Sequence, residues 1–128
     1  MKRGFTLLEL IVVIIIIGIL ATLGFTQYTR VIEKGRTAEA KALLGQMRTA
    51  QEAYMLENGS YTATIGNLAV AVPTGSCVTT HYFVYYTTAT AGNANRCIAG
   101  GKTPNSVVLY SIILNYATGV WSGTAGYY

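Results

Sequence analysis

The sequence predicts an α+β fold in which one long amino-terminal helix packs on a small antiparallel β-sheet of three to four strands. Three observations lead to this expectation. An apolar segment occupies residues 5–25, and an amphipathic pattern typical of a helix covers residues 26–57. Beyond them, residues 81–88 and 107–116 are rich in the β-branched and aromatic side chains that favour strands. The two helical patterns are contiguous, so one continuous helix is expected.

The composition separates a charged first part from a nearly uncharged second part. The chain has 128 residues, of which 52% are hydrophobic and only 11% charged, against about 25% charged residues in an average soluble protein. The acidic residues all precede residue 58: they are Glu9, Glu33, Glu39, Glu52 and Glu57. The net charge is +4, but two of the basic residues lie before residue 4 and no basic stripe follows, so nucleic-acid binding is not indicated.

The segment 5–25 is long enough to cross a membrane, which takes about 20 residues. Lys2 and Arg3 precede it and would keep the amino terminus in the cytoplasm while the rest of the chain crosses. A secretory signal peptide shares the basic start. It is disfavoured because the apolar segment is long, contains a carboxylate and lacks a small-x-small cleavage site near its end. A plain membrane anchor stays open, but it leaves Glu9 unexplained.

Glu9 places a carboxylate inside the apolar segment, at a cost of roughly 2.5–3.5 kcal/mol on insertion scales. A single helix offers it no basic partner nearby. Cleavage between Gly4 and Phe5 would create an ammonium group at Phe5, which could neutralise the Glu9 carboxylate of a neighbouring copy. Glu9 would then set the register between packed helices. The alternative is that Glu9 lies near enough to the membrane surface to be hydrated.

The run Lys2-Arg3-Gly4-Phe5-Thr6-Leu7-Leu8-Glu9, followed by a long apolar segment, resembles the processing motif of type IV prepilins and pseudopilins. The resemblance covers residues 1 to about 61 closely and the remainder only in architecture. It implies that a prepilin peptidase cleaves after Gly4 and N-methylates Phe5. It also implies that Glu9 contacts the terminal amine of Phe5 in an adjacent subunit during assembly.

One position departs from the family pattern. Many members have a proline where this chain has Thr26, and that proline helps the helix to kink or melt in filaments. Gly18 and Gly24 are the remaining weak points, since glycine within a helix is about 1 kcal/mol less favourable than alanine. The predicted organisation is a leader (residues 1–4), a transmembrane and filament-core helix (5–25), its amphipathic half (26–57) and a pilin head of loop and sheet (58–128).

The amphipathic half should pack on one side only. Its apolar residues recur every three or four positions: Ile32, Ala40, Leu43, Leu44, Met47, Ala50, Tyr54 and Met55. The charged residues fall mostly elsewhere on the wheel, where Arg48 and Glu52 are spaced for an ion pair. Asn58-Gly59 should end the helix, because both residues tolerate the left-handed conformation.

The second part reads as a loop followed by a meander. Residues 60–80 have no clear period and are expected to be a loop with short structured pieces, and residues 91–95 are expected to form a turn after the first strand. Residues 117–119 would connect the second strand to a short strand at Val120-Trp121. One face of the second strand should lie against the helix; its residues are Val108, Tyr110, Ile112, Leu114 and Tyr116.

Cys77 and Cys97 flank the first predicted strand and could form a disulfide if this part of the chain reaches an oxidising compartment. Two buried free thiols are the alternative. The resemblance to pilins favours a bond, although the disulfide of that family more often closes a loop near the carboxyl terminus.

The sequence does not predict an enzyme. After residue 57 there is one histidine and no acidic residue, so a nucleophile with a base, a carboxylate pair and a metal cluster are all missing. His81 and Cys77 are too weak a signal for a metal site, and no cofactor is indicated. The ten tyrosines raise the ideas of adhesion and electron conduction, but core and subunit packing accounts for them.

The function predicted from these residues and the resemblance is that of a structural subunit of a type IV pilus filament. The expected partners are further copies of the chain, the prepilin peptidase, and the assembly ATPase and platform. The precursor would lie in the inner membrane and the product in an extracellular pilus.

Two alternatives remain. The first is a major pseudopilin of a type II secretion system, in a periplasmic pseudopilus. Such proteins resemble this chain but bind calcium through an acidic loop, and acidic ligands are missing after Glu57. The second is a monomeric membrane-anchored binding module, which would show neither cleavage after Gly4 nor an effect of Glu9 on assembly.

Overall fold

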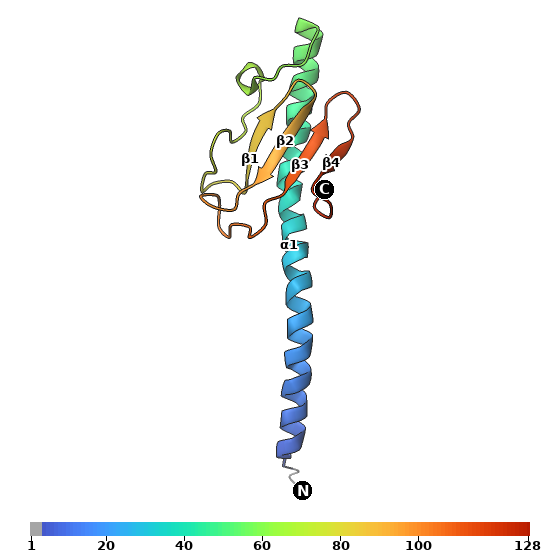
Figure 1. The fold of residues 1–128 in the computed structure, drawn as a ribbon, viewed down its shortest axis with the longest axis vertical. Helices are drawn as coiled ribbons and strands as arrows, with labels where there is room; N and C mark the ends of the chain where they lie inside the picture. Colours follow the sequence, from blue (N-terminus) through green and yellow to red (C-terminus); the bar gives the residue numbers. More distant parts are fainter. Residues whose placement is uncertain (1–3) are drawn as a thin grey trace. The chain divides into compact units, whose positions relative to one another are not determined.

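The computed structural model describes residues 4–128 and has the predicted α+β fold (Figure 1). Its elements, in chain order, are helix α1 (Leu7–Asn58), the short 3-10 helix η1 (Ile65–Asn67), and strands β1 (Phe83–Thr87), β2 (Ala91–Arg96), β3 (Ser111–Asn115) and β4 (Trp121–Gly123). The chain divides into two compact units, one ending at Glu33 and one covering Lys34–Tyr128. We call their described residues the amino-terminal unit (4–33) and the head unit (34–128).

Helix α1 ends where the sequence predicts. Its last residue is Asn58, and Gly59 follows with a φ of 76°. The Gly59 N–H donates a hydrogen bond to the Met55 carbonyl (2.8 Å), so the left-handed residue satisfies one of the carbonyls that every helix end leaves open. Upstream, the helix is continuous through Gly18, Gly24 and Thr26.

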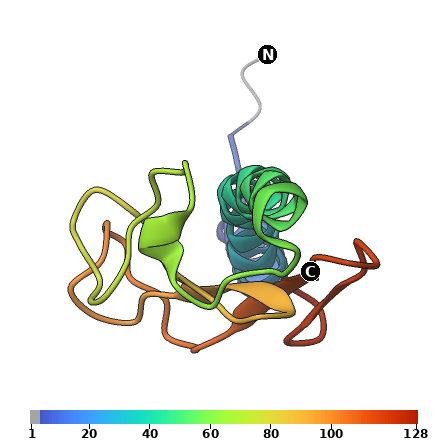
Figure 2. The same cartoon turned by 90° about the horizontal axis from the view of Figure 1, so that it is seen from above.

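The four strands form an antiparallel meander in the order β1-β2-β3-β4, and the part of α1 that belongs to the head unit lies over one face of it (Figure 2). The two predicted strand segments are confirmed as β1 and β3, each shorter than its pattern. The predicted turn at 117–119 is also present, with Gly119 at a φ of 70° before β4.

The prediction of a turn at residues 91–95 is wrong, because this segment is strand β2, in the middle of the sheet. Its sequence, Ala-Gly-Asn-Ala-Asn-Arg, has low strand propensity. The small residues Gly92 and Ala94 face the helix, and a Cβ added at Gly92 would lie 2.9 Å from Met47 Sδ and 3.1 Å from Leu44 Cδ2. Close approach of the helix therefore selects small side chains here, and pairing on both edges overrides propensity.

The core of the head unit lies between α1 and the inner face of the sheet. From the helix, Ala40, Leu44 and Met47 are completely buried. From the sheet and its flanks come Phe83, Tyr85, Ala94, Tyr110, Ile112, Leu114 and Tyr116. The predicted inner face of the second strand is thus confirmed except at one position.

Two residues expected in the core are exposed. Val108 is 47% exposed because it lies in the loop before β3 begins, and Met55 is 41% exposed near the end of α1, beyond the cover of the sheet. In their place the structure buries two polar helix residues, Thr37 and Gln51.

Candidate assembly site

The predicted cleavage site lies just before α1, in a segment without regular secondary structure. Gly4 and Phe5 are both exposed, Phe5 by 77%. A Cβ added at Gly4 would meet no atom within 4 Å, so no described residue other than its chain neighbours crowds this position. Lys2 and Arg3, the basic part of the predicted motif, lie outside the described residues.

Glu9 has a local partner that the sequence reading missed. The Glu9 N–H donates to Thr6 Oγ1 (3.2 Å), and the Thr6 N–H in turn points at Glu9 Oε2 (3.5 Å). This is the reciprocal capping box that Ser or Thr forms with Glu three residues later at a helix start. The spacing Thr-x-x-Glu was the signal that could have revealed it. The contact of Glu9 with Phe5 of another subunit stays a prediction.

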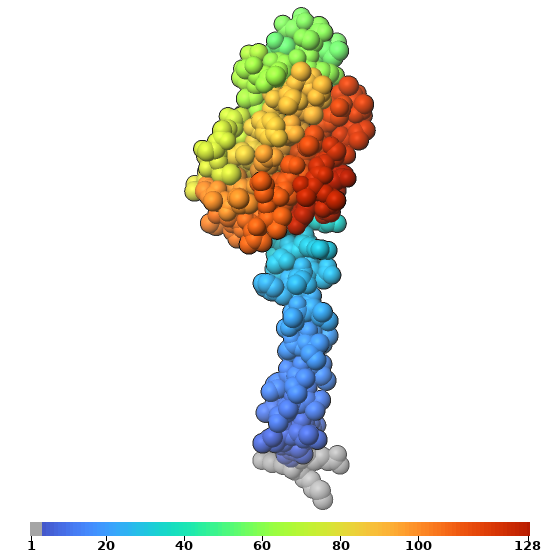
Figure 3. Space-filling view, viewed as in Figure 1, coloured from blue at the N-terminus to red at the C-terminus, as the bar shows by residue number. Residues whose placement is uncertain are grey.

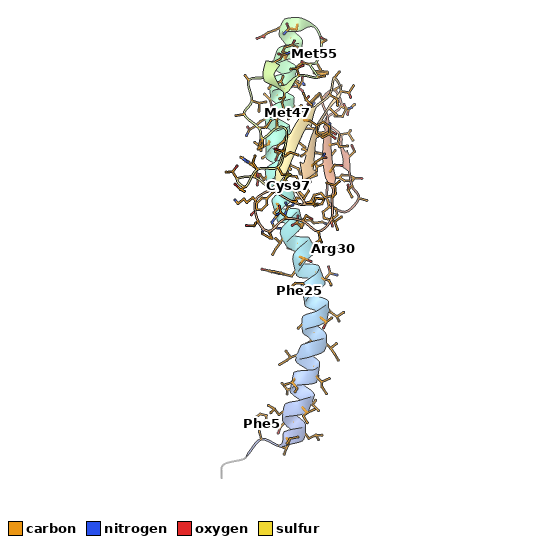
Figure 4. All side chains as sticks on the ribbon, turned by 60° about the vertical axis from the view of Figure 1, so that its left-hand side comes forward. Phe5, Phe25, Arg30, Met47, Met55 and Cys97 are labelled. Carbon is orange, nitrogen blue, oxygen red and sulfur yellow. A yellow bond between two sulfur atoms is a disulfide. The ribbon has the colours of Figure 1, made fainter. Side chains whose placement is uncertain are left out.

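The first part of α1 has a mostly apolar and exposed surface. Between Leu7 and Val31 every described side chain is exposed, from 40% at Ile11 to 76% at Leu7 for the large hydrophobic ones (Figure 4). Among the described residues, α1 alone is long and apolar enough to cross a membrane. An exposed apolar surface of this length requires lipid or protein around it.

The threonines of this segment need no outside partner. Thr22 donates to the Gly18 carbonyl (2.9 Å), Thr26 to the Leu23 carbonyl (3.1 Å) and Thr29 to the Thr26 carbonyl (3.0 Å). A hydroxyl bonded to its own helix can enter an apolar environment without the penalty of an unpaired polar group. These hydroxyls are therefore compatible with burial in lipid or among other helices.

In the head unit, a buried polar network ties the helix to the loop and the sheet. Gln51, fully buried, donates to the Thr62 carbonyl (2.7 Å) and to Thr87 Oγ1 (2.9 Å), and its own carbonyl accepts from the Thr62 N–H (3.0 Å). The Tyr116 hydroxyl hydrogen-bonds Thr87 and contacts Met47 Sδ at 3.2 Å. Burial raises the pKa of the Tyr116 hydroxyl, although its hydrogen bonds act in the opposite direction.

A second group of contacts organises the loop of residues 97–110, which connects β2 to β3. Arg96 is 1% exposed, and its guanidinium donates to the carbonyls of Tyr82 (3.1 Å), Cys97 (3.1 Å) and Pro104 (2.9 Å). The Tyr82 ring also faces Arg36 (5.0 Å) and Lys102 (4.9 Å). This end of the head unit therefore gathers basic groups around one aromatic ring.

The disulfide joins Cys77, in the loop after the helix, to Cys97, directly after β2, with the two Cα atoms 5.9 Å apart. The alternative of two free thiols is wrong. A Cβ added at Gly101 would lie 2.4 Å from Cys97 Cβ, so the loop folds back on the bond. The disulfide thus links the long loop that precedes β1 to the loop that connects β2 and β3.

Comparison with known families matches both parts of the chain. Residues 1–25 match the prokaryotic N-terminal methylation motif, and residues 37–126 match the family of type IV pilin-like G and H proteins. Because the second match covers most of the chain, the protein belongs to the type IV pilin family, whose members are structural and not enzymatic.

Individual relatives include pilins and a secretion protein. The chain is 42% identical over 57 residues to the type IV major fimbrial protein FimA of Dichelobacter nodosus (44% of this chain, 36% of the relative). It is 33% identical over 75 residues to the type IV major pilin PilA of Myxococcus xanthus (59% and 34%). It is 36% identical over 77 residues to the type II secretion system core protein G of Pseudomonas aeruginosa (59% and 54%). The matches thus span a third to about half of these relatives.

Proposed function

We propose that the chain is a major structural subunit of a type IV pilus, made as a membrane precursor, cleaved after Gly4, N-methylated at Phe5 and assembled through α1. The observation that carries the proposal is the exposed, mostly apolar helix surface between Leu7 and Val31, which begins within the motif Gly4 to Glu9. Copies of this surface packed against one another would bury it. The methylation-motif match and the pilin relatives support the same conclusion.

In this proposal the amino terminus of the precursor lies in the cytoplasm and the head unit is exported through the inner membrane. The disulfide Cys77–Cys97 supports export, because such bonds persist in oxidising compartments. After cleavage, the new ammonium group at Phe5 of one copy would meet the Glu9 carboxylate of another as the helices pack. A prepilin peptidase, an assembly ATPase and a platform protein would act on the chain in turn.

A second candidate, a major pseudopilin of a type II secretion system, has a specific observation in its favour. The type II secretion core protein G is matched over a larger share of its length (54%) than FimA or PilA. Against it, the chain has no aspartate and its last acidic residue is Glu57, whereas the acidic calcium loop expected of such proteins needs carboxylate ligands. We therefore prefer the pilus.

The experiment separates the two roles open to Glu9. Glu9→Gln keeps the side-chain acceptor of the capping box but removes the charge, whereas Thr6→Ala removes half of the cap and keeps the charge. Filaments sheared from cells would be quantified against total subunit, and their amino-terminal peptide analysed by mass spectrometry. We expect wild-type filaments to begin with N-methylated Phe5, Glu9→Gln to give almost none, and Thr6→Ala to give a near-normal yield.

Three outcomes would contradict the proposal. Intact chains beginning at Met1 in every strain would exclude processing, and the anchored binding module would replace the pilin. If Glu9→Gln assembled normally and Thr6→Ala did not, Glu9 would act as a helix cap only. If export of other secreted proteins stopped without the gene while no surface filament was ever found, the pseudopilin would be preferred.

A further inference from the structure

The loop of residues 97–110 exposes an apolar tip at one end of the head unit. Val107 is completely exposed, Leu109 is 62% exposed and Ile98 is 52% exposed. A hydrogen bond from the Ser106 N–H to the Cys97 carbonyl (3.1 Å) brings Ile98 and Val107, the residues that follow, to the same part of the loop. Because several exposed aliphatic side chains share one loop, this tip is a candidate contact surface.

An open groove of about 470 Å³ lies toward the other end of the head unit. It is lined from α1 by Gln46, Thr49, Ala50 and Ala53 and from the loop after the helix by Ala69, Val70 and Ala71. The lining carries no charge and consists mostly of small side chains, so aliphatic groups of another chain could enter it. Figures 1 and 3 show the 97–110 loop (orange) at the opposite end of the head from the end of α1 (green).

The charges of the two ends are complementary. Lys102 is exposed in the loop, beside the Tyr82 ring. At the groove end, Glu57 is exposed four residues after Ala53, hence on the same helix face, and the last helical turn has no basic residue. The negative end of the helix dipole adds to the charge of Glu57.

Lys102 and Glu57 are too far apart to pair within one copy. Arg36 faces the same Tyr82 ring as Lys102, and Arg36 precedes Glu57 by 57 − 36 = 21 residues of α1, which is about 30 Å at the helical rise. That distance exceeds the screening length of about 8 Å at physiological salt. The two charges can therefore meet only between different copies.

We infer that the apolar tip around Val107 of one copy occupies the groove at Ala50 and Ala53 of the next copy. Lys102 of the first copy then forms an ion pair with Glu57 of the second. This inference rests on the proposed filament function and specifies how heads contact one another. Each head carries both surfaces at opposite ends, so the contact is head-to-tail. Contacts of that type do not form a two-fold dimer; they form a ring where the rotation closes and an open helical assembly, as in the proposed filament, where it does not.

Photo-crosslinking in assembled filaments tests the apolar part. A benzophenone amino acid is incorporated at position 107, where full exposure makes disruption of the fold small, and at Val120 (60% exposed), a matched valine in the β3 to β4 connection. We expect position 107 to crosslink to groove residues 46–53 or 69–71 of another copy, and position 120 not to. Crosslinks from position 107 only to residues 7–31 of another copy, or none at all, would overturn the inference.

Carbodiimide treatment of the same filaments tests the charged part. We expect an amide between Lys102 and Glu57 of different copies, identified as a crosslinked peptide, which Lys102→Arg eliminates while filaments persist. Lys102→Glu and Glu57→Lys should each lower the filament yield several-fold, and the double variant should restore most of it. Failure of the double variant to recover would contradict the pairing.

The controls keep the two proposals apart. If wild-type chains form no filaments, the proposed function fails before the contact is tested. If wild-type filaments form normally but neither the photo-crosslink nor the amide appears, the filament proposal stands and this head-to-tail contact is wrong.

Discussion

The two parts of α1 have the same backbone conformation but differ in what covers their apolar side chains. In the head unit, Leu44 and Met47 are completely buried under the protein's own sheet. In the amino-terminal unit, Ile14 and Leu20 are 58% and 63% exposed. The comparison shows that the apolar side chains of the first part do not contribute to a core within the chain. Their cover has to come from lipid or from protein outside this chain, and under the proposed function that protein is a further copy.

Polar side chains differ between the two regions in the same way. Thr22 and Thr26 bond carbonyls three or four residues away in their own helix, so their partners move with them. Gln51 instead bonds Thr62 and Thr87, which lie in other segments. The first arrangement permits exchange between lipid and protein surroundings, whereas the second fixes one tertiary structure.

The largest expected effect tests directly whether the two parts of α1 differ in how their apolar side chains are covered. Leu44→Ala should lower the free energy of unfolding of the head by about 2–5 kcal/mol, the usual cost of a cavity in a packed core. Leu20→Ala, the same change on the exposed part of the helix, should alter it by less than about 0.5 kcal/mol. Denaturant unfolding of the detergent-solubilised chain, followed by Trp121 fluorescence, measures both.

The filament yield should respond to Leu20→Ala, however, because in the proposed filament this residue packs against other copies, a contact that forms only on assembly. The comparison would be wrong if Leu20→Ala destabilised the head in detergent as strongly as Leu44→Ala, since the amino-terminal segment would then have a cover within its own chain.

A smaller effect is expected from the polar network. Gln51→Leu leaves the Thr62 backbone groups and Thr87 without their buried partner, and it should cost about 1–3 kcal/mol. Gln46→Leu, on the exposed side of the same helix, should have little effect on unfolding. Hydrogen exchange gives a local check, because the Thr62 amide should lose protection in the first variant only. Unchanged protection in Gln51→Leu would mean that the network does not hold the loop.

Much of the architecture could be predicted because it depends on local rules. The end of the helix at Asn58 follows from the glycine after it, and the inner face of β3 follows from alternation at Ile112 and Leu114. Strand β2 could not be predicted in this way. Its small residues are explained only by the helix that approaches Gly92, and that approach is a tertiary fact absent from any window of sequence.

In the candidate site, too, features set by contiguous residues could be predicted, whereas features that depend on tertiary contacts could not. The motif from Gly4 to Glu9 is contiguous and could be read directly, and its Thr6 to Glu9 capping box could have been read as well. The groove at Ala53 could not be anticipated, because it forms between segments that meet only in the folded head. Gln51 was also missed, since a glutamine on an amphipathic helix ordinarily faces solvent.

The smallest effects are expected at two buried tyrosines of the core, one with hydrogen-bond partners for its hydroxyl and one without. Tyr116 has hydrogen-bonding partners in Thr87 and Met47, so Tyr116→Phe should cost about 1 kcal/mol at neutral pH. Tyr85 is 1% exposed, and among the described residues its hydroxyl has no hydrogen-bond partner. Tyr85→Phe should therefore be neutral or slightly stabilising, because it removes an unpaired buried polar group.

The pH dependence of unfolding separates these two tyrosines from the exposed ones. Burial raises the pKa of the Tyr85 hydroxyl well above its ordinary value of 10.0, with a further rise from the Glu39 carboxylate, and burial raises that of Tyr116 as well. Above pH 10 the unfolded chain releases these protons while the folded chain retains them, so the contribution of these two hydroxyls to the free energy of unfolding should be constant below pH 10 and fall above it. Tyr85→Phe should make that fall shallower, whereas Tyr86→Phe, at a 46% exposed position on the same strand, should not. An equally steep fall in all three proteins would show that the Tyr85 hydroxyl reaches water in the folded head.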